Sequence, residues 1–387
     1  MPTVLVTGAN GFIGRNLCAR LRERADLAVL TAGRNTPDSV LERAVATADV
    51  IVHLAGVNRP PDPSEFDRGN IGYTKTLARM VSKLPRPRRI IFASSIQAGN
   101  DTPYGQSKRT AEEHLQNLAE DHPVAVSVLR LLNVFGKWCR PNFNSVVATF
   151  CHNIANDLPI NIHDPARVVD LVFIDDVIEA IEREIESPIV PHEFRYCAAE
   201  IPSSKVTLED LANHLRTFRE IRTSLLIPDL STRVLQQLYA TYLSYVQPKE
   251  TAYSLHARHD TRGSLAEFLK SEAAGQIFVS RTRPGITRGN HYHHTKTEKF
   301  LVLEGEGLIE LRQIDSDAKV EFRASGTDYR VVDIPPGYTH SITNVGDSDL
   351  VTLFWASEIF DANRADTFPL PVVPNKATPE IRQEQAA

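Results

Sequence analysis

The pattern of hydrophobic and polar positions changes once along the chain and predicts two kinds of architecture. In the first part, short apolar runs alternate with stretches of helical period, the rhythm of βαβ units in a parallel, doubly wound sheet. Residues 207–221 and 231–246 follow as helices, and Thr207 and Asp210 have capping-box spacing at the start of the first. The predicted strands of this part are Val4–Thr7, Leu27–Thr31, Val50–Leu54, Arg89–Ser94 and Val126–Leu131.

In the second part, short strands follow one another without a long helical period. Glycine is absent between Gly136 and Gly263 and is then common again, as in sheet punctuated by turns. We therefore predict a Rossmann-like α/β domain over residues 1–250, an all-β barrel or jelly roll over 251–365, and an extended or disordered tail over 366–387. The predicted strands are Gln276–Thr282, Glu298–Leu303, Gly307–Ile314, Asp328–Ile334 and Leu350–Trp355.

Composition narrows the class of protein. A length of 387 residues exceeds one ordinary domain, and a net charge of -5 gives no bias toward nucleic acid or anionic membrane. The chain has neither a signal-peptide pattern nor an apolar stretch long enough to span a bilayer. The four cysteines are widely spaced, which favours a reducing compartment. We predict a cytoplasmic protein that binds neither nucleic acid nor membrane.

The segment VTGANGFIG places Gly8, Gly11 and Gly14 directly after a strand and at the start of a helix. Glycines there let the backbone approach a pyrophosphate, and the helix terminus supplies amide donors. About twenty residues later, where an acid would bind a ribose 2′-hydroxyl, the chain reads LTAGRN and offers Arg34 instead. This favours NADP(H) over NAD as the cofactor, with Arg34 as a plain surface residue being the alternative.

A second group of polar residues follows the strand that ends in IFASSIQAG. Ser94 and Ser95 end this strand, and PYGQSK places Tyr104 and Lys108 four residues apart on one helical face. A tyrosine has a reference pKa of about 10, and a neighbouring lysine cation makes it a usable proton donor near neutral pH. A serine hydroxyl nearby orients a carbonyl group. The pattern is typical of ketone reduction.

With HLAG at residues 53–56, RLLNVFG at 130–136 and VDLVFIDDV at 169–177, residues 1–245 resemble the extended short-chain dehydrogenase/reductase family. The resemblance implies that Ser95 orients the carbonyl, with Ser94 as the alternative. It implies that Tyr104 donates the proton, that Lys108 adjusts the pKa of this tyrosine, and that Asn133 lies near the substrate. Ser95 and Tyr104 are only nine residues apart, fewer than in most of the family, which predicts a more open pocket. The implied cofactor contacts are Gly8, Gly11, Phe12, Ile13, Gly14, Arg34, Leu54, Ala55 and Lys108.

A cluster of histidines stands in GNHYHHTKTEKFLVLEG. Its spacing fits the first cupin motif, G-x5-H-x-H-x4-E-x6-G, and DIPPGYTHSITN resembles the second, although Tyr329 replaces its leading glycine. Alternate residues of a strand share a face, so the side chains can meet inside a barrel. Three imidazoles and a carboxylate suit a divalent ion, above all Zn²⁺. The alternative is a metal-free sugar-binding barrel. The predicted ligands are His291, His293, Glu298 and His340.

The flanking segments DTRGSLAEF and TRGNHYHH resemble deoxysugar-nucleotide epimerases that contain no metal. In those enzymes the matching histidine is the general base, and here it is His291. An imidazole bound to a metal ion cannot also take a proton, so His291 is either the ligand or the base. If it is the ligand, the base is another residue, and the candidates are Tyr292, His294, Lys299 and Tyr338.

The whole chain is similar to the bifunctional CapF-type enzymes of capsule and O-antigen biosynthesis. That resemblance implies a UDP-linked 4-keto-6-deoxy amino sugar as substrate, UDP-2-acetamido-2,6-dideoxy-hexos-4-ulose, with C3 epimerisation in a zinc-containing cupin. Reduction by NADPH would then give UDP-N-acetyl-L-talosamine on the way to N-acetyl-L-fucosamine. The resemblance also implies a homodimer.

Three other interpretations stay open at this level. The barrel is a structural or dimerising module beside a single-activity reductase, or it is a metal-dependent oxygenase. The third is a non-catalytic NADP-binding protein, which the presence of Ser95, Tyr104 and Lys108 disfavours.

Overall fold

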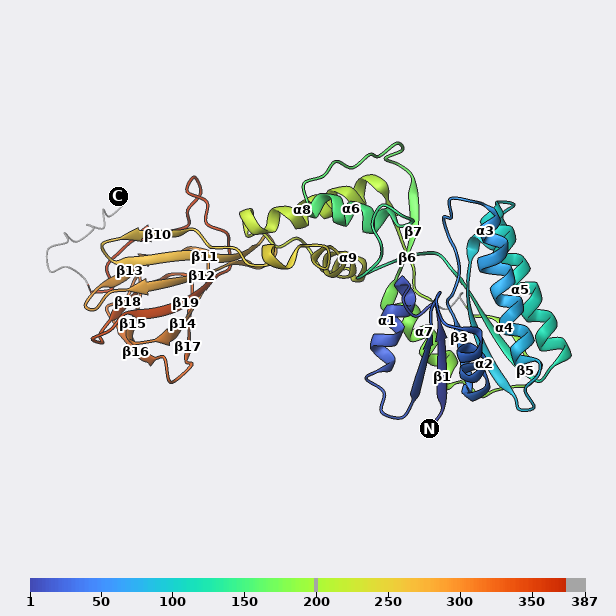
Figure 1. Cartoon of the computed structure of the whole chain (residues 1–387). Helices are drawn as coiled ribbons and strands as arrows, with labels where there is room; N and C mark the ends of the chain where they lie inside the picture. Colours follow the sequence, from blue (N-terminus) through green and yellow to red (C-terminus); the bar gives the residue numbers. More distant parts are fainter. Residues whose placement is uncertain (198–200, 374–387) are drawn as a thin grey trace, which may run out of the picture. The chain divides into compact units, whose positions relative to one another are not determined.

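The computed structural model describes residues 1–197 and 201–373. Contacts divide the chain into two compact units (Figure 1). The first unit comprises Met1–Arg216 and Ser231–Pro248, and the second comprises Thr217–Leu230 and the residues from Lys249 onward. The sequence predicted one boundary near residue 250. The chain enters the second unit there, but Thr217–Leu230 also belongs to that unit. Of the predicted tail, residues 374–387 lie outside the described part.

The first unit is built on a parallel sheet of six strands, as the βαβ rhythm predicted. The strand order is β2-β1-β3-β4-β5-β8, and every neighbouring pair is parallel. Its strands are near-continuous apolar runs because helices cover the sheet on both faces. The strands are β1 (Thr3–Thr7), β2 (Ala28–Ala32), β3 (Val50–His53), β4 (Arg88–Ser95), β5 (Val124–Leu131) and β8 (Phe194–Tyr196).

Alternation along β1 shows how the two faces are filled. Val4 and Val6 pack with helices α1 (Phe12–Leu21) and α7 (Ile174–Glu186). Leu5 points the other way and packs with the helices of the opposite face. All strands run the same way, so the loops after β1, β3 and β4 meet at one edge, where such folds bind ligands. The helices of the second face are α2 (Asp38–Thr47), α4 (Tyr73–Val81) and α5 (Pro103–Asp121).

A smaller sheet and further helices complete the first unit. The sheet has the order β6-β7-β9 and consists of β6 (Asn133–Phe135), β7 (Val168–Phe173) and β9 (Ser204–Thr207). Thr207 Oγ1 accepts from the Asp210 amide at 3.0 Å and donates to the Asp210 carboxylate at 2.7 Å, so the predicted pairing of these residues at the start of α8 is confirmed. The remaining elements of this unit are α3 (Ser64–Phe66), η1 (Asp67–Gly72), η2 (Ile96–Gly99), α6 (Val146–Ala155) and α9 (Arg233–Leu243). Helices α8 (Leu208–Ser224) and η4 (Pro248–Glu250) each begin in this unit and end in the second.

The second unit consists of two antiparallel sheets, as the second sequence pattern predicted. One has the order β10-β11-β12-β19-β14-β17 and the other β16-β15-β18-β13-β20. The strands of the first are β10 (Ala257–Asp260), β11 (Gly263–Ser271), β12 (Gly275–Thr282), β19 (Leu350–Ala356), β14 (Glu298–Glu304) and β17 (Val331–Ile334). Those of the second are β16 (Lys319–Ser325), β15 (Glu306–Gln313), β18 (Tyr338–Asn344), β13 (Thr287–Tyr292) and β20 (Phe368–Pro369).

Apolar side chains from both sheets form one core in the second unit. Phe300 on β14 and Phe354 on β19 come from one sheet, and Ile309 on β15 and Ile342 on β18 from the other. Their alternation with outward polar residues is the pattern expected of sheets that pack face to face. This core fixes the strands that carry the histidine cluster.

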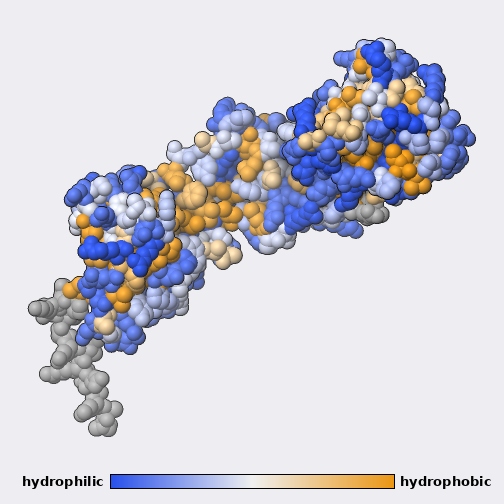
Figure 2. Space-filling model, turned by 90° about the horizontal axis from the view of Figure 1, so that it is seen from below, coloured by the Kyte–Doolittle hydropathy of each residue, from blue (hydrophilic) through white to orange (hydrophobic). Residues whose placement is uncertain are grey.

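Hydrophilic residues cover most of the surface seen in Figure 2, interrupted by hydrophobic patches. Among the described residues, every helix is too short or too polar to cross a bilayer.

Candidate active site and metal centre

The glycine segment forms a tight cradle between β1 and α1. Gly8 has a φ of +70°, and a Cβ there would lie 2.6 Å from the backbone nitrogen of Ala55. A Cβ at Gly14 would lie 2.2 Å from the Gly8 carbonyl oxygen. Gly11 is the N-cap of α1 and makes no side-chain capping bond, so the first amides of the helix remain available to an anion. The residues fit a pyrophosphate group.

A cavity of about 830 Å³ opens beside this cradle, entirely within the first unit. Ala55 is the one predicted cofactor contact that does not line it, because it backs the Gly8 turn instead. Asn133 lines the cavity as well, and its side chain donates to the Asp170 carbonyl at 3.0 Å. The predicted residues that line the cavity are Gly8, Gly11, Phe12, Ile13, Gly14, Arg34, Leu54, Ser94, Ser95, Tyr104 and Lys108.

Helix α5 brings the tyrosine and the lysine to the cavity. Its N-terminus is stabilised because the hydroxyl of Thr102, the N-cap residue, accepts a hydrogen bond from the Gly105 amide at 3.1 Å and because proline occupies the first turn. Tyr104 then lies one turn before Lys108, whose Nζ donates to the Ala93 carbonyl at 2.9 Å. Burial raises the pKa of Tyr104, and a hydrogen bond with Ser95 opposes that rise.

The structure distinguishes the two serines at the end of β4. Ser94 Oγ donates to the buried carboxylate of Glu112. Arg130 Nε also donates to that carboxylate, at 3.0 Å. Ser95 is held differently, since its hydroxyl accepts from the Gln97 amide at 3.2 Å and lies within reach of Tyr104. Ser95 is therefore the serine beside the tyrosine, and Ser94 is bound to Glu112.

Two buried residues that the sequence analysis did not single out support this site. Asn70 donates to Ser107 Oγ at 2.8 Å and accepts from the Val57 amide at 2.7 Å, so it ties the loop after β3 to α5. Glu112 follows Lys108 by four residues, so a helical-face argument extended by one turn would have found it. Asn70 had no comparable signal, because its partners are distant in sequence.

Burial lowers the pKa of Lys108 to about 8. The unfolded chain holds this proton up to a pKa of about 10.5, so the charge penalises folding below pH 8, and stability is regained as the pH rises toward 10.5. We expect Lys108→Met to raise the free energy of unfolding of the cofactor-free protein by up to about 3 kcal/mol at pH 7. Urea unfolding at several pH values measures the difference, which should shrink above pH 8. A difference independent of pH would contradict this account.

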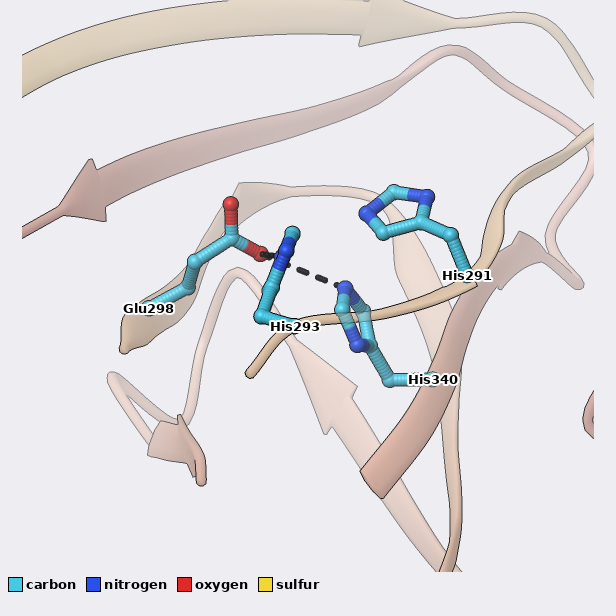
Figure 3. Close-up of side chains that lie close together, drawn as sticks. All are labelled: His291, His293, Glu298 and His340. Atoms are coloured by element: carbon cyan, nitrogen blue, oxygen red, sulfur yellow. Dashed lines mark ion pairs between the residues drawn. The ribbon is translucent and has the colours of Figure 1, made fainter. Parts of the chain in front are cut away.

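The predicted metal ligands converge in the second unit (Figure 3). His291 lies on β13 opposite His340 on β18, His293 follows the end of β13, and Glu298 begins β14. One potential ligand atom from each residue lies within 4.8 Å of all the others. The Glu298 carboxylate is 3.2 Å from His340 Nε2 and 3.4 Å from His293 Nε2. Residues from both sheets thus form a single four-residue cluster.

The cluster fits a divalent cation. His293 is 1% exposed and His340 is fully buried, yet the Nε2 atom of each lacks a hydrogen-bond partner of acceptable geometry. Such orphaned nitrogens facing a carboxylate are what an ion would satisfy. Burial, with His340 nearby, lowers the pKa of His291 to about 4. Burial disfavours the charge on Glu298, but His293 and His340 hold the pKa of that carboxyl below its usual range.

A cavity of about 460 Å³ in the second unit is bounded by His291, Glu298 and His340. Among the residues that the structure describes, the lining of this cavity includes none of the four candidate bases, Tyr292, His294, Lys299 and Tyr338. Tyr292 stacks on Phe368 instead, with ring centroids 5.4 Å apart, and His294 meets Phe368 edge to face at 4.7 Å. The other two are also engaged elsewhere: Lys299 pairs with Asp333 at 2.5 Å, and Tyr338 packs against the core between the sheets. The structure adds Lys296, which does line the cavity.

Comparison with known proteins matches both units. Residues 4–194 match the NAD dependent epimerase/dehydratase family, and residues 258–368 match the polysaccharide biosynthesis C-terminal domain. The chain is 43% identical to a UDP-2-acetamido-2,6-beta-L-arabino-hexul-4-ose reductase of Pseudomonas aeruginosa, over 94% of this chain and 97% of the relative. It is 40% identical to the crystal structure of capsular polysaccharide assembling protein CapF from Staphylococcus aureus, with a TM-score of 0.87, over 96% of this chain and all of that one. The chain belongs to the CapF-type family.

Membership in the CapF-type family makes this protein an enzyme of the nucleotide-sugar reductase and epimerase kind. More distant structures match only part of the chain. One is a Bordetella bronchiseptica enzyme, WbmF, in complex with NAD+, at 18% identity and a TM-score of 0.53 over 63% of this chain. That likeness shows the fold alone.

Proposed function

We propose that this CapF-type enzyme epimerises UDP-2-acetamido-2,6-dideoxy-hexos-4-ulose at C3 in its second unit and reduces the C4 ketone with NADPH in its first. The product would be UDP-N-acetyl-L-talosamine, on the way to N-acetyl-L-fucosamine for capsule or O-antigen. The observation that carries the reduction is the placement of Ser95, Tyr104 and Lys108 on the cavity that the glycine cradle opens into. The name of the Pseudomonas relative supports a UDP-linked 4-keto sugar.

The residues of the cavity would hold NADPH, which would supply the hydride for C4. Tyr104 donates its proton to the oxygen, which would otherwise become an alkoxide. Ser95 orients the carbonyl beside Tyr104 by a hydrogen bond. Lys108 is buried and lies one turn of α5 after Tyr104. Its ammonium group stabilises the charge left on the phenolate after proton transfer.

In the epimerisation, the cluster would hold a divalent ion, which we propose to be Zn²⁺ and which would act as a Lewis acid that makes the C3 hydrogen more acidic. We assign His291 to the ion, because it is part of the cluster as well as of the cavity wall. One group on the wall then removes the C3 proton, and a proton returns from the opposite face. Glu267, Lys296 and Glu358 are titratable groups on that wall. Glu267 is paired with Lys270 at 3.0 Å, and Glu358 accepts a hydrogen bond from the Thr295 hydroxyl at 3.3 Å, so we favour Lys296 as the group that faces the sugar.

We further propose that the enzyme acts as a homodimer. The strands β10 and β16 lie at the ends of their sheets among the described residues, and an open edge offers hydrogen-bonding groups to a second chain.

The direct test supplies the 4-keto substrate and NADPH to the purified enzyme, follows NADPH absorbance, and identifies the product by NMR. A product inverted at C3 and reduced at C4 supports the proposal. A reduced product that keeps its C3 configuration would instead favour the single-activity reductase, with the second unit as a structural or dimerising module.

Arg34 is proposed to bind the 2′-phosphate of NADPH, because it lines the cofactor cavity at the end of β2. We expect Arg34→Ser to raise the KM for NADPH about tenfold and to leave the KM for NADH almost unchanged. This is the effect of losing one charge-assisted contact worth about 1.4 kcal/mol. Arg43→Ser, an exposed arginine on α2, is the matched control. An equal change in the KM for NADPH and for NADH would show that Arg34 is a plain surface residue that does not bind the 2′-phosphate.

A further inference from the structure

The segment Asp366–Val372, here called the Asp366 clamp, follows the last long strand of the second unit and returns to the metal cluster. Its strand β20 pairs antiparallel with β13, placing Pro369 opposite His291 and Phe368 opposite Tyr292. The clamp therefore extends the sheet that carries His291 and His340. It is separated from the histidine segment by about seventy residues of chain.

Asp366 makes a dense set of contacts with the turn after His293. Its carboxylate accepts from the backbone amides of His294 at 2.9 Å, Thr295 at 2.8 Å and Lys296 at 2.9 Å. Partial burial opposes the charge, but these amides hold the pKa of Asp366 below its usual range. An ionised carboxylate with three amide donors is a strong anchor. It fixes the turn that joins two of the cluster's residues, His293 and Glu298.

The backbone of Asp366 reaches the cluster directly. Its carbonyl oxygen accepts a hydrogen bond from Nδ1 of His293. A carbonyl can only accept, so this contact requires the proton on Nδ1 and leaves the Nε2 lone pair free. His293 Nε2 is the nitrogen that faces Glu298. The clamp thus selects both the tautomer and the ring orientation that a metal ligand needs.

The next residue of the clamp holds the lysine of the cavity. Lys296 Nζ donates to Thr367 Oγ1 at 3.1 Å, and both residues line the cavity. The far end of the clamp is secured independently. Arg312, which is 6% exposed, donates to the carbonyl oxygens of Pro371 at 3.0 Å and Val372 at 2.8 Å. Val372 itself is 1% exposed. The segment is a fixed part of the unit at both ends.

We propose that the Asp366 clamp is a positioning element of the second-unit site, which orients His293 toward the metal ion through Asp366 and holds Lys296 at the cavity wall through Thr367. The inference rests on the proposed metal site. It assigns a role in that site to a segment that lies beyond the strands bearing the ligands.

The test measures Zn²⁺ affinity of the full-length protein by competition with a chromophoric chelator. We expect Asp366→Ala to weaken binding about 10- to 100-fold, the range for groups that orient a metal ligand. Asp361→Ala, which removes an exposed carboxylate from the preceding loop, should bind Zn²⁺ as the wild type does. Asp366→Ala keeps the backbone carbonyl but removes the carboxylate that holds this carbonyl beside His293. Histidine side-chain nitrogen NMR of the metal-free protein should therefore show the His293 proton on Nδ1 in the wild type and a mixture of tautomers in the variant. A merely structural role would not change this signature.

A second variant tests the clamp independently, in case Asp366→Ala does not fold. Thr367→Val removes only the Lys296 contact, so we expect unchanged Zn²⁺ affinity and C3 exchange reduced about tenfold. Unchanged affinity and an unchanged tautomer in folded Asp366→Ala would overturn the clamp's action on His293. Unchanged exchange in Thr367→Val would overturn its action on Lys296. A wild-type protein that binds no Zn²⁺, but keeps the Nδ1 proton on His293, would overturn the metal proposal and with it the clamp's role toward an ion.

Discussion

Tyr104→Phe is expected to lower the rate of NADPH oxidation by a factor of about 10² to 10⁴. The C3 hydrogen of the substrate should still exchange with D₂O. The variant removes one hydroxyl, that of the proposed proton donor on the cavity wall, and proton transfer by a positioned side chain contributes about that factor. The second unit is untouched, because Tyr104 lies in the first unit. Proton NMR of the 4-keto substrate in D₂O reports exchange at C3, and NADPH absorbance reports reduction.

Tyr73→Phe is the matched control for this variant. Tyr73 begins α4 and is not on the cavity wall, and its ring packs at a tilt against His53 at 5.6 Å, so its hydroxyl should be dispensable for reduction. If Tyr104→Phe retained full reductase activity, another donor would be responsible and the roles proposed for α5 would fail. If it lost reduction and C3 exchange together, the two reactions would not be separable and the second unit would not be an independent epimerase.

The second large effect is expected from His340→Ala. His340 is fully buried, lies opposite His291 in the sheet and faces Glu298. Its loss removes one of four proposed ligands, so Zn²⁺ affinity should fall by more than the roughly 100-fold upper range for groups that only orient a ligand. C3 exchange should fall at least as far, whereas reduction of a ketone already inverted at C3 should proceed at the wild-type rate. Metal analysis after dialysis and NMR in D₂O measure the two losses.

His259→Ala provides the control, since His259 is an exposed histidine of the same unit on β10. Chelation of the wild type should reproduce the His340→Ala result and lower the melting temperature, because an ion that binds only the folded state stabilises it. Full C3 exchange in metal-free protein would remove the ion from the mechanism. The structural alternative predicts a different outcome. In that case the wild type would show no C3 exchange, and His340→Ala would lose dimerisation but keep full reductase activity.

Local spacing was enough to predict much of both sites. The glycines of VTGANGFIG, Tyr104 with Lys108, and the histidine segment each lie within a few residues of one another, so strand and helix periodicity already places them together. The two sheet architectures followed from the same periodicity. Arg34 could also be located by counting from the glycine motif, and it lines the same cavity.

Contacts between distant parts of the chain decided the rest. Glu112 binds Ser94 and leaves Ser95 beside Tyr104, a choice that two adjacent serines in a strand do not reveal. Tyr292 and His294, which share the histidine motif, point away from the cavity onto Phe368. Thr217–Leu230 joins the second unit although its sequence reads as part of the first.

The sequence by itself therefore determined the two folds, the glycine motif and the identity of the clustered histidines and glutamate, because these depend on residues spaced by one strand or helix period. Only the tertiary structure showed which serine meets the tyrosine, which side chains face the second cavity, and that Asp366 holds the turn after His293 from 73 residues away. Such partners meet because the core fixes the register of strands that are remote in sequence, and side-chain periodicity carries no information about which remote residue will be opposite.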